Sequence, residues 1–373
     1  MSAASSAQEA TQPGPVFIVG SMRSGSTLLR LILDSHPDIA IGPESGFMSG
    51  LAGVKEVPNW QWGAGWFERL GWSEEELDER LRVFYDGIFR RYAEQRGKQR
   101  WGEKTPFHTS HIDEMARVFP DAVFVGIVRH PGAVAVSLRK KFHYTFSDAV
   151  DYWMSTNYDL VRSGSTLSRR FVLIRYEDLL RDGEAVLREL MAAIDEPWHP
   201  HLLEHHHVQR AQGAPRVAEG STVTRDAIDP TRADRWIDAV SPPDHDPLRR
   251  TSGFADVFGY RPLDPAVDMP PGSAGSPRWV VDGDCLAERW SQWRDRPTEA
   301  PGRPASVVEA SREQLAARLA VAEQALVRAR ARRAVRVVDA VRKVQRGRTP
   351  SDVRAAWTLL RGMQGTSAPQ GRG

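Results

Sequence analysis

Three short apolar runs stand out along the chain, at residues 15–20, 121–128 and 171–174. Each run is four to eight residues long, and each ends at a glycine or is followed by an arginine. Unbroken apolar runs of this length are typical of strands that are buried on both faces of a parallel sheet. The pattern therefore predicts three central strands.

Helical patterns alternate with these strands. Apolar residues within 28–33 recur at helical spacing, and Ser73 followed by three glutamates predicts the start of a helix that reaches about Tyr92. Strands that alternate with helices predict an α/β fold with a central parallel sheet, which binds its ligands at the carboxyl ends of the strands. Further helices are expected over 112–119, 132–141 and 184–194.

Composition narrows the class of protein. A chain of 373 residues suits one large α/β domain or two ordinary ones. Its single cysteine, Cys285, excludes an intramolecular disulfide and any zinc site that needs several thiolates. The first residues lack the basic and apolar regions of a secretory signal, and no apolar run approaches the roughly 18 residues of a membrane span. We therefore expect a cytoplasmic protein.

The chain divides into five expected segments by composition. Its start is small and polar, its middle carries the alternating pattern, and a stretch rich in proline, glycine and serine precedes an alanine- and arginine-rich helical region. The expected segments are a disordered N-terminus (1–14), an α/β domain (15–262), a linker or flank (263–304), a basic amphipathic or coiled-coil helix (305–346), and a short helix with a disordered tail (347–373). Within the domain, 40–65 is rich in glycine and tryptophan and is expected as loop.

A glycine-bearing loop joins the first strand to the first helix. Residues 20–27 read GSMRSGST, with the two glycines at the spacing of a P-loop. Backbone N–H groups and a helix N-terminus would form an anion cradle there, and Arg23 adds charge, although Ser26 stands where nucleotide-binding loops carry lysine. The alternative is a turn that only joins the two elements. The loop predicts phosphate or sulfate binding. Together with the alternating strands and helices it predicts a P-loop-type, three-layer α/β fold, to which the region after residue 304 would add a C-terminal helical extension.

Two further cationic positions follow the strands. Arg129 ends the second strand and Ser137 comes eight residues later, so an arginine and a hydroxyl could hold one phosphate from two sides. A surface basic cluster is the alternative interpretation. Lys104, within WGEKTP, is expected as a single cation in a turn.

Together these motifs resemble the sulfotransferases that use 3′-phosphoadenosine 5′-phosphosulfate (PAPS), in the form shared by bacterial members and protein-tyrosine sulfotransferases. The likeness spans about 15–262 and includes GEKTP around Lys104 and RYEDL from 175 to 179. It implies a 5′-phosphosulfate site, a 3′-phosphate site and an adenine contact. The implied residues are, in that order, Arg23, Ser24, Gly25, Ser26 and Thr27; Arg129 and Ser137; and Tyr176, with Ser221 and Arg235 in a later nucleotide-contacting segment. The aspartate that usually follows the strand-end arginine is His130 here.

The chemistry implied by this resemblance is in-line sulfuryl transfer to a hydroxyl, supported by positioning and electrostatics. Arg23 and Lys104 would stabilise the sulfuryl oxygens, and Glu44 stands where the tyrosine-sulfating branch carries its catalytic glutamate. His108 is a rival base; His36 and Glu103 are weaker ones. The expected reaction moves a sulfuryl group from PAPS to a small molecule, glycan or glycolipid, releases 3′-phosphoadenosine 5′-phosphate (PAP), and uses no metal.

Two other functions stay open at this point. A P-loop kinase would share the anion loop, although Ser26 in the lysine position argues against magnesium-bound nucleotide. A degenerate nucleotide fold could instead serve as an adaptor. Three adjacent histidines, 205–207, cannot all face one metal ion on a regular element, so we expect them to be solvated.

The charge of the chain is unevenly distributed. The net charge of +2 hides a basic tail, because 305–373 carries fourteen Lys or Arg against five acids and the other 304 residues carry 36 against 43. The helix over 305–346 could therefore meet an anionic membrane surface or a coiled-coil partner, and its short heptad seam would suit a homodimer. Specific nucleic-acid recognition is not expected. Because this tail is basic, we also expect that the protein could lie peripherally at the inner membrane surface.

Overall fold

The computed structural model describes residues 13–59, 61–211, 226–261, 263–267 and 280–295. All of them belong to one compact unit, Met1–Glu309. The second unit, Ala310–Gly373, lies outside the described residues. The predictions of a basic helix over 305–346, a tail over 347–373 and disorder at the N-terminus therefore concern parts of the chain that the structure does not describe.

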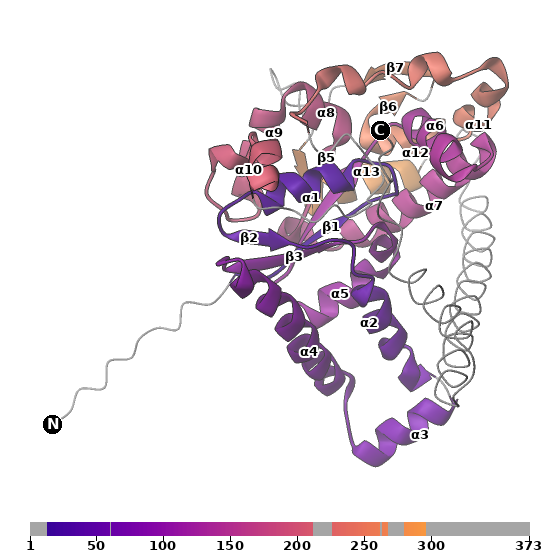
Figure 1. Cartoon of the computed structure of the whole chain (residues 1–373). Helices are drawn as coiled ribbons and strands as arrows, with labels where there is room; N and C mark the ends of the chain where they lie inside the picture. The colour runs from indigo at the N-terminus through magenta and orange to yellow at the C-terminus, as the bar shows by residue number, and fades with distance from the viewer. Residues whose placement is uncertain (1–12, 60, 212–225, 262, 268–279, 296–373) are drawn as a thin grey trace, which may run out of the picture. The chain divides into compact units, whose positions relative to one another are not determined.

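A central sheet forms the middle of the domain (Figure 1). It has six strands in the order β2-β3-β1-β4-β5-β8. Its first five strands are parallel, and β8 pairs antiparallel with β5 at one edge. The three predicted strands are confirmed as β1, β4 and β5. The strands are β1 (Val16–Val19), β2 (Ile39–Ile41), β3 (Arg100–Lys104), β4 (Val123–Val128), β5 (Phe171–Arg175) and β8 (Val280–Asp282).

Helices cover both faces of this sheet, which confirms the three-layer α/β prediction. Along β1, Val16 and Ile18 belong to one apolar cluster, with the helices α1, α8 and α9, whereas Phe17 and Val19 belong to the other, with α4, α5 and α7. The bounds of these helices, and of α6, which follows β4, are α1 (Ser26–Asp34), α4 (Glu74–Gln95), α5 (Ile112–Val118), α6 (Pro131–Phe142), α7 (Phe146–Gly164), α8 (Tyr176–Arg181) and α9 (Gly183–Ala193).

The expected loop over 40–65 is wrong for most of its length. It holds β2, α2 (Phe47–Lys55) and the start of α3 (Gln61–Leu70). Met48, Leu51 and Ala52 are buried one helical turn apart and pack α2 against the core. Gly46, left-handed at φ 70°, lets the chain turn directly into this helix.

The expected linker over 263–304 also differs from the structure. Residues 264–267 form β7, which pairs with β6 (Tyr260–Arg261), and β8 leads into the helix α13 (Gly283–Arg294). On α13, Leu286, Trp290 and Trp293 are buried in the same apolar cluster as α7. The domain therefore continues to at least residue 294, because these apolar side chains complete its core.

Candidate active site

The loop between β1 and α1 has the backbone of an anion cradle. Gly20 and Gly25 have φ angles of 149° and 101°, and Arg23 between them is also left-handed at φ 68°. Ser24 donates its hydroxyl to the carbonyl of Ser21 (2.6 Å), which closes the loop. The loop ends at the N-terminus of α1, where the first N–H groups have no carbonyl partner within the helix.

Two side chains from distant elements hold this loop, and sequence reasoning missed both. Thr109 Oγ1 accepts the N–H of Gly20 (2.8 Å), and Tyr152 on α7 accepts the N–H of Met22 (2.9 Å). Burial raises the pKa of Tyr152 to about 12, so its phenol is neutral at physiological pH. No local motif marks either residue, because each acts only through the packing of its element beside the loop.

Arg23 and Arg129 lie together at the carboxyl ends of the neighbouring strands β1 and β4. The Arg23 Nε–H donates to Ser137 Oγ (2.9 Å), and Arg129 Nη1 donates to the carbonyl of Arg23 (3.2 Å). The pKa of the Arg23 guanidinium is lowered, first by burial and then by the positive charge of Arg129. Two cations held this close call for an anion between them.

The buried polar atoms of this region fit the same interpretation. Within the described residues, neither Arg23 nor Arg129 forms an ion pair with a carboxylate, and Arg129 Nε and Ser21 Oγ are buried without a hydrogen-bond partner. Buried donors of this kind are costly unless a ligand satisfies them. The residues present therefore fit a phosphate or sulfate group.

Tyr176 connects the two anion positions. Its ring lies under the Arg129 guanidinium, 4.5 Å from the centroid, and a Cβ on Gly25 would stand 2.2 Å from its Cδ2 atom. The pKa of the Tyr176 phenol is raised by burial, which outweighs the lowering by Arg129.

His130, which stands where the family usually has an aspartate, caps a helix and packs on a tryptophan and does not orient Arg129. Its Nδ1 accepts the N–H of Gly132 (3.2 Å) at the start of α6, and its ring stacks on Trp236 with centroids 4.3 Å apart. The Tyr176 ring and the carbonyl of Arg23 orient Arg129 instead.

Lys104 is not in a turn, as the sequence suggested, but at the carboxyl end of β3, where it is fully buried. It reaches Thr27 Oγ1 at the start of α1 (3.2 Å) and forms an ion pair with Glu44, whose side chain is 42% exposed. The strand places Lys104 because β3 lies directly beside β1 in the sheet. Lys104, Thr27 of the phosphate loop and Glu44 thus meet at the carboxyl ends of β3 and β1.

Glu103 and His108 form a buried pair next to Lys104. Their Oε2 and Nδ1 atoms are 2.7 Å apart, and both residues are at most 3% exposed. The Glu103 Oε1 atom also accepts hydrogen bonds from Thr105 Oγ1 (2.7 Å) and Ser45 Oγ (2.9 Å). Burial raises the pKa of Glu103, but the hydrogen bonds from His108, Thr105 and Ser45 lower it by more. The pKa of Glu103 therefore lies below its ordinary value.

Of the last two nucleotide candidates, Ser221 lies outside the described residues. Arg235 is described, and it is not brought to this site. Arg235 is largely exposed and donates to Asp229 (3.0 Å) and to Thr231 (2.7 Å), two neighbours on its own segment. The structure gives Arg235 no contact with the phosphate loop within the described residues.

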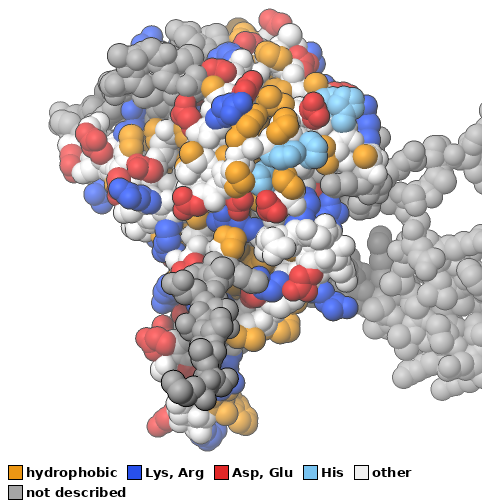
Figure 2. Space-filling model, turned by 90° about the vertical axis from the view of Figure 1, so that its left-hand side faces the viewer, with side chains coloured by type: hydrophobic (Ala, Val, Ile, Leu, Met, Phe, Trp, Pro, Cys, Tyr) orange, Lys and Arg blue, Asp and Glu red, His pale blue; other side chains and the backbone are white. Residues whose placement is uncertain are grey.

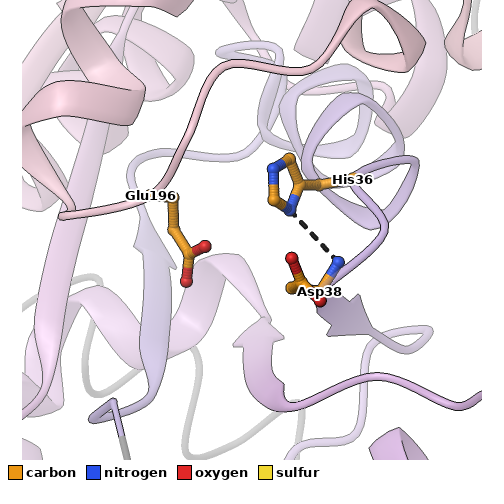
Figure 3. Close-up of side chains that lie close together, drawn as sticks. All are labelled: His36, Asp38 and Glu196. Atoms are coloured by element: carbon orange, nitrogen blue, oxygen red, sulfur yellow. Dashed lines mark hydrogen bonds between the residues drawn. The ribbon is translucent and has the colours of Figure 1, made fainter.

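His36 follows α1 and precedes β2, at the amino ends of the strands, so it is no rival base. A nine-residue helix, α1, separates it from the phosphate loop by about 13 Å. Its ring lies close to two carboxylates, those of Asp38 and Glu196, and one potential metal-binding atom from each of the three residues lies within 4.8 Å of the others (Figure 3). Both ring nitrogens are occupied, however, by the N–H of Asp38 (3.2 Å) and the carbonyl of Pro197 (2.9 Å).

Histidine side chains gather on the face of the domain that Figure 2 shows. The expected solvated run at 205–207 is wrong for its first member, because His205 begins the helix α10 (His205–Ala211) and is fully buried. Burial lowers the pKa of His205 to about 4, so its ring is neutral.

The sequence of the chain is similar to that of one enzyme family. A family model described as the sulfotransferase family matches residues 15–200. The chain belongs to this family. It is therefore an enzyme that transfers a sulfuryl group. The matches favour neither of the two alternatives, a P-loop kinase or a non-catalytic adaptor.

Several sulfotransferases resemble the chain at modest identity. A Caenorhabditis briggsae protein named as a protein-tyrosine sulfotransferase is 24% identical, over 66% of this chain and 88% of its own length. Protein-tyrosine sulfotransferase 1 of Danio rerio is 23% identical, over 60% of this chain and 66% of its length. The sulfotransferase domain of the Synechococcus PCC 7002 olefin synthase is 24% identical, over 70% of this chain and 99% of its own, with a TM-score of 0.49.

Within the described residues, no helix is both long and apolar enough to cross a bilayer.

Proposed function

We propose that this sulfotransferase moves a sulfuryl group from PAPS to a hydroxyl group and releases PAP. One observation carries the proposal: Arg23 and Arg129, without carboxylate partners among the described residues, converge beside a helix N-terminus at the ends of β1 and β4. A donor with phosphates at both its 5′ and 3′ positions would satisfy both cations.

The two ends of the donor would bind on opposite sides of β1. The 5′-phosphosulfate would lie on the segment 23–27 and the N–H groups of α1, close to Lys104 on the β3 side. The 3′-phosphate would lie on the β4 side, held by Arg129 and Ser137, and Tyr176 would contact the adenine. This division follows from the sheet order, in which β1 stands between β3 and β4.

Catalysis would rest on charge stabilisation and on removal of one proton. Sulfuryl transfer spreads negative charge over the peripheral and bridging oxygens, and Lys104 and Arg23 would stabilise it from a buried position. The candidate proton acceptors are Glu44, which pairs with Lys104, and His108, which pairs with Glu103. No metal ion takes part in this proposal.

We propose a small molecule, a glycan or a glycolipid as acceptor, in the cytoplasm. The relatives named above act, by their names, on protein tyrosine, and they share with this proposal a hydroxyl acceptor. The basic segment 305–346 would bind an anionic surface at the inner membrane or a coiled-coil partner, which includes a second copy of the chain.

Calorimetry with PAP tests the donor directly. We expect PAP to bind without magnesium and to compete with PAPS. Incubation with labelled PAPS and an extract of the producing cells should then label one acceptor. Absence of PAP binding, or magnesium-dependent hydrolysis of ATP, would contradict the proposal and revive the kinase alternative.

A further inference from the structure

The phosphate loop between β1 and α1 contains a turn with an arginine where glycine is usual. The N–H and the hydroxyl of Ser24 both donate to the carbonyl of Ser21 (3.2 and 2.6 Å), so this segment forms a β-turn. Arg23 is the third residue of the turn and has a φ of 68°, whereas the φ of Met22 before it is not positive. This combination defines a type II turn, whose third residue is normally glycine because a Cβ atom disfavours positive φ.

The left-handed backbone places Arg23 among the groups of the anion site. Its Nε–H donates to Ser137 Oγ (2.9 Å), and its carbonyl accepts from Arg129 (3.2 Å). Arg23 therefore contacts both residues assigned to the 3′-phosphate while it belongs to the 5′-phosphosulfate loop. An unfavourable backbone conformation of this kind persists only where surrounding contacts fix it. The turn therefore needs support from outside its own hydrogen bonds.

Two hydroxyl groups from other parts of the fold supply this support. Tyr152 on α7 accepts the N–H of Met22 (2.9 Å), the second residue of the turn. Thr109 is buried in the short 3₁₀ helix η2 (Pro106–His111). Its Oγ1 atom accepts the N–H of Gly20 (2.8 Å) and lies 3.2 Å from the carbonyl oxygen of the same residue. The two hydroxyls come from positions 130 and 89 residues further along the chain.

A tyrosine suits this place because its hydroxyl is neutral. Burial raises the pKa of Tyr152 to about 12, and it outweighs the lowering by the N–H of Met22. The phenol therefore accepts this N–H at physiological pH without a negative charge beside the anion position. An ionised carboxylate could accept the same hydrogen bond, but it would repel a phosphate or sulfate group.

We propose that Tyr152 and Thr109 are positioning residues that hold the phosphate loop in its anion-binding conformation before the donor arrives. The inference rests on the proposed function. Neither hydroxyl touches the donor in this proposal, because each acts through the backbone of Met22 or Gly20. Without one of them the loop would populate other conformations, and the affinity for the donor would fall by the fraction that is lost. The bound donor would restore the loop, so turnover at saturating PAPS should change little.

Amide exchange in the full chain tests the tyrosine contact without any ligand. Methionine is labelled with ¹⁵N, and the Met22 signal is the one that Met22→Leu removes. We expect Tyr152→Phe, which removes only the hydroxyl, to speed exchange of the Met22 amide about 10-fold. Tyr158→Phe is the matched control on the same helix, where the ring packs on Trp290 (5.2 Å between centroids), and should leave this amide unchanged. Unchanged exchange in Tyr152→Phe would overturn the proposal.

Calorimetry with PAP tests the consequence for binding. We expect Tyr152→Phe and Thr109→Val each to weaken PAP binding about 3- to 10-fold, the range of one net hydrogen bond. Thr109→Ser keeps the hydroxyl and should bind within about twofold of the wild type. Thr251→Val is the matched control, because Thr251 is also buried and its hydroxyl donates to the carbonyl of Leu248 (2.8 Å) instead of the loop. Equal losses in Thr109→Val and Thr251→Val would contradict the proposal.

Kinetics separate a positioning role from a catalytic one. With the acceptor found by labelling, the KM for PAPS should rise in Tyr152→Phe in step with the weaker PAP binding, while kcat changes less than about twofold. A fall in kcat with unchanged KM would contradict the proposal, because Tyr152 would then act in the transfer step. Failure of the wild type to bind PAP would instead refute the proposed function and leave the amide-exchange result intact.

Discussion

The guanidinium of Arg129 lies over the ring of Tyr176, with 4.5 Å between its central carbon and the ring centroid. The same ring packs on Gly25 in the phosphate loop, where a Cβ atom would stand 2.2 Å from it. Tyr176 thus sets the separation between the loop that follows β1 and the arginine that follows β4. The geometry of the anion site therefore depends on contacts among three residues, Gly25, Arg129 and Tyr176, which follow the ends of β1, β4 and β5.

Replacing Arg129 tests the 3′-phosphate assignment. Because a charge-assisted bond to phosphate contributes about 1.5–3 kcal/mol, we expect Arg129→Ala to weaken PAP binding about 10- to 100-fold. Arg129→Lys should recover only part of the loss, since it keeps the charge without the planar fork. Calorimetry measures both. Arg188→Ala, which removes an exposed arginine paired with Glu184, should bind normally; a parallel loss there would point to a general charge effect.

Gly25→Ala should distort the loop. The left-handed φ of 101° costs an alanine about 1 kcal/mol or more, and its Cβ would overlap the Tyr176 ring. We expect a lower Tm and loss of PAP binding, measured by thermal melting and calorimetry. The control is Gly53→Ala on α2, whose Cβ would meet nothing within 4 Å and should raise stability by up to about 1 kcal/mol. Equal Tm values for the two variants would contradict the argument.

Lys104→Met should separate chemistry from folding. The methionine can occupy the buried end of β3 but offers no charge to the sulfuryl oxygens, so kcat should fall about 10²- to 10³-fold. Lys104→Arg keeps the charge and should lose less. Rates of PAP release at saturating PAPS measure the effect. A rise in the KM for PAPS with unchanged kcat would contradict this role, because Lys104 would then contribute to binding of PAPS and not to the transfer step.

Acid should destabilise the domain partly through Glu103. Its pKa in the folded protein lies below the ordinary 4.5, with hydrogen bonds from His108, Thr105 and Ser45 outweighing burial. The ionised carboxylate therefore stabilises the fold above its unfolded pKa, and this contribution is lost as the pH falls through the lower folded value. Glu103→Gln should flatten the acid side of the stability profile, measured by urea unfolding from pH 7 to pH 3. An unchanged slope would show that Glu103 is not ionised in the fold.

Truncation tests where the domain ends. A chain that stops after residue 304 keeps β8 and α13 and should bind PAP, whereas one that stops after 262 loses both and should not fold. Trp290→Ala in the full chain should cost about 3–5 kcal/mol, because the indole is buried against α7 and its neighbours. Circular dichroism and urea unfolding measure these differences. A folded, PAP-binding chain of 262 residues would contradict the assignment of α13 to the core.

The local sequence was sufficient to predict those strands and loops whose character is set by adjacent residues in the chain. Unbroken apolar runs marked β1, β4 and β5, two glycines marked the phosphate loop, and Arg129 was found by its place at a strand end. The strand β3 escaped detection because it carries Arg100, Glu103 and Lys104, polar residues that are buried only because partners elsewhere satisfy them.

The site itself was decided by the tertiary structure. The sheet order inserts β3 between β2 and β1, and this brings Lys104 to Thr27 across 77 residues of sequence and to Glu44 across 60. The packing of α7 beside the phosphate loop likewise brings Tyr152 to Met22 across 130 residues of sequence. The chain's sequence determined which residues can bind an anion or accept a proton. Only the pairing of strands far apart in sequence decided which of them meet, because burial and hydrogen-bond partners are properties of the packed sheet.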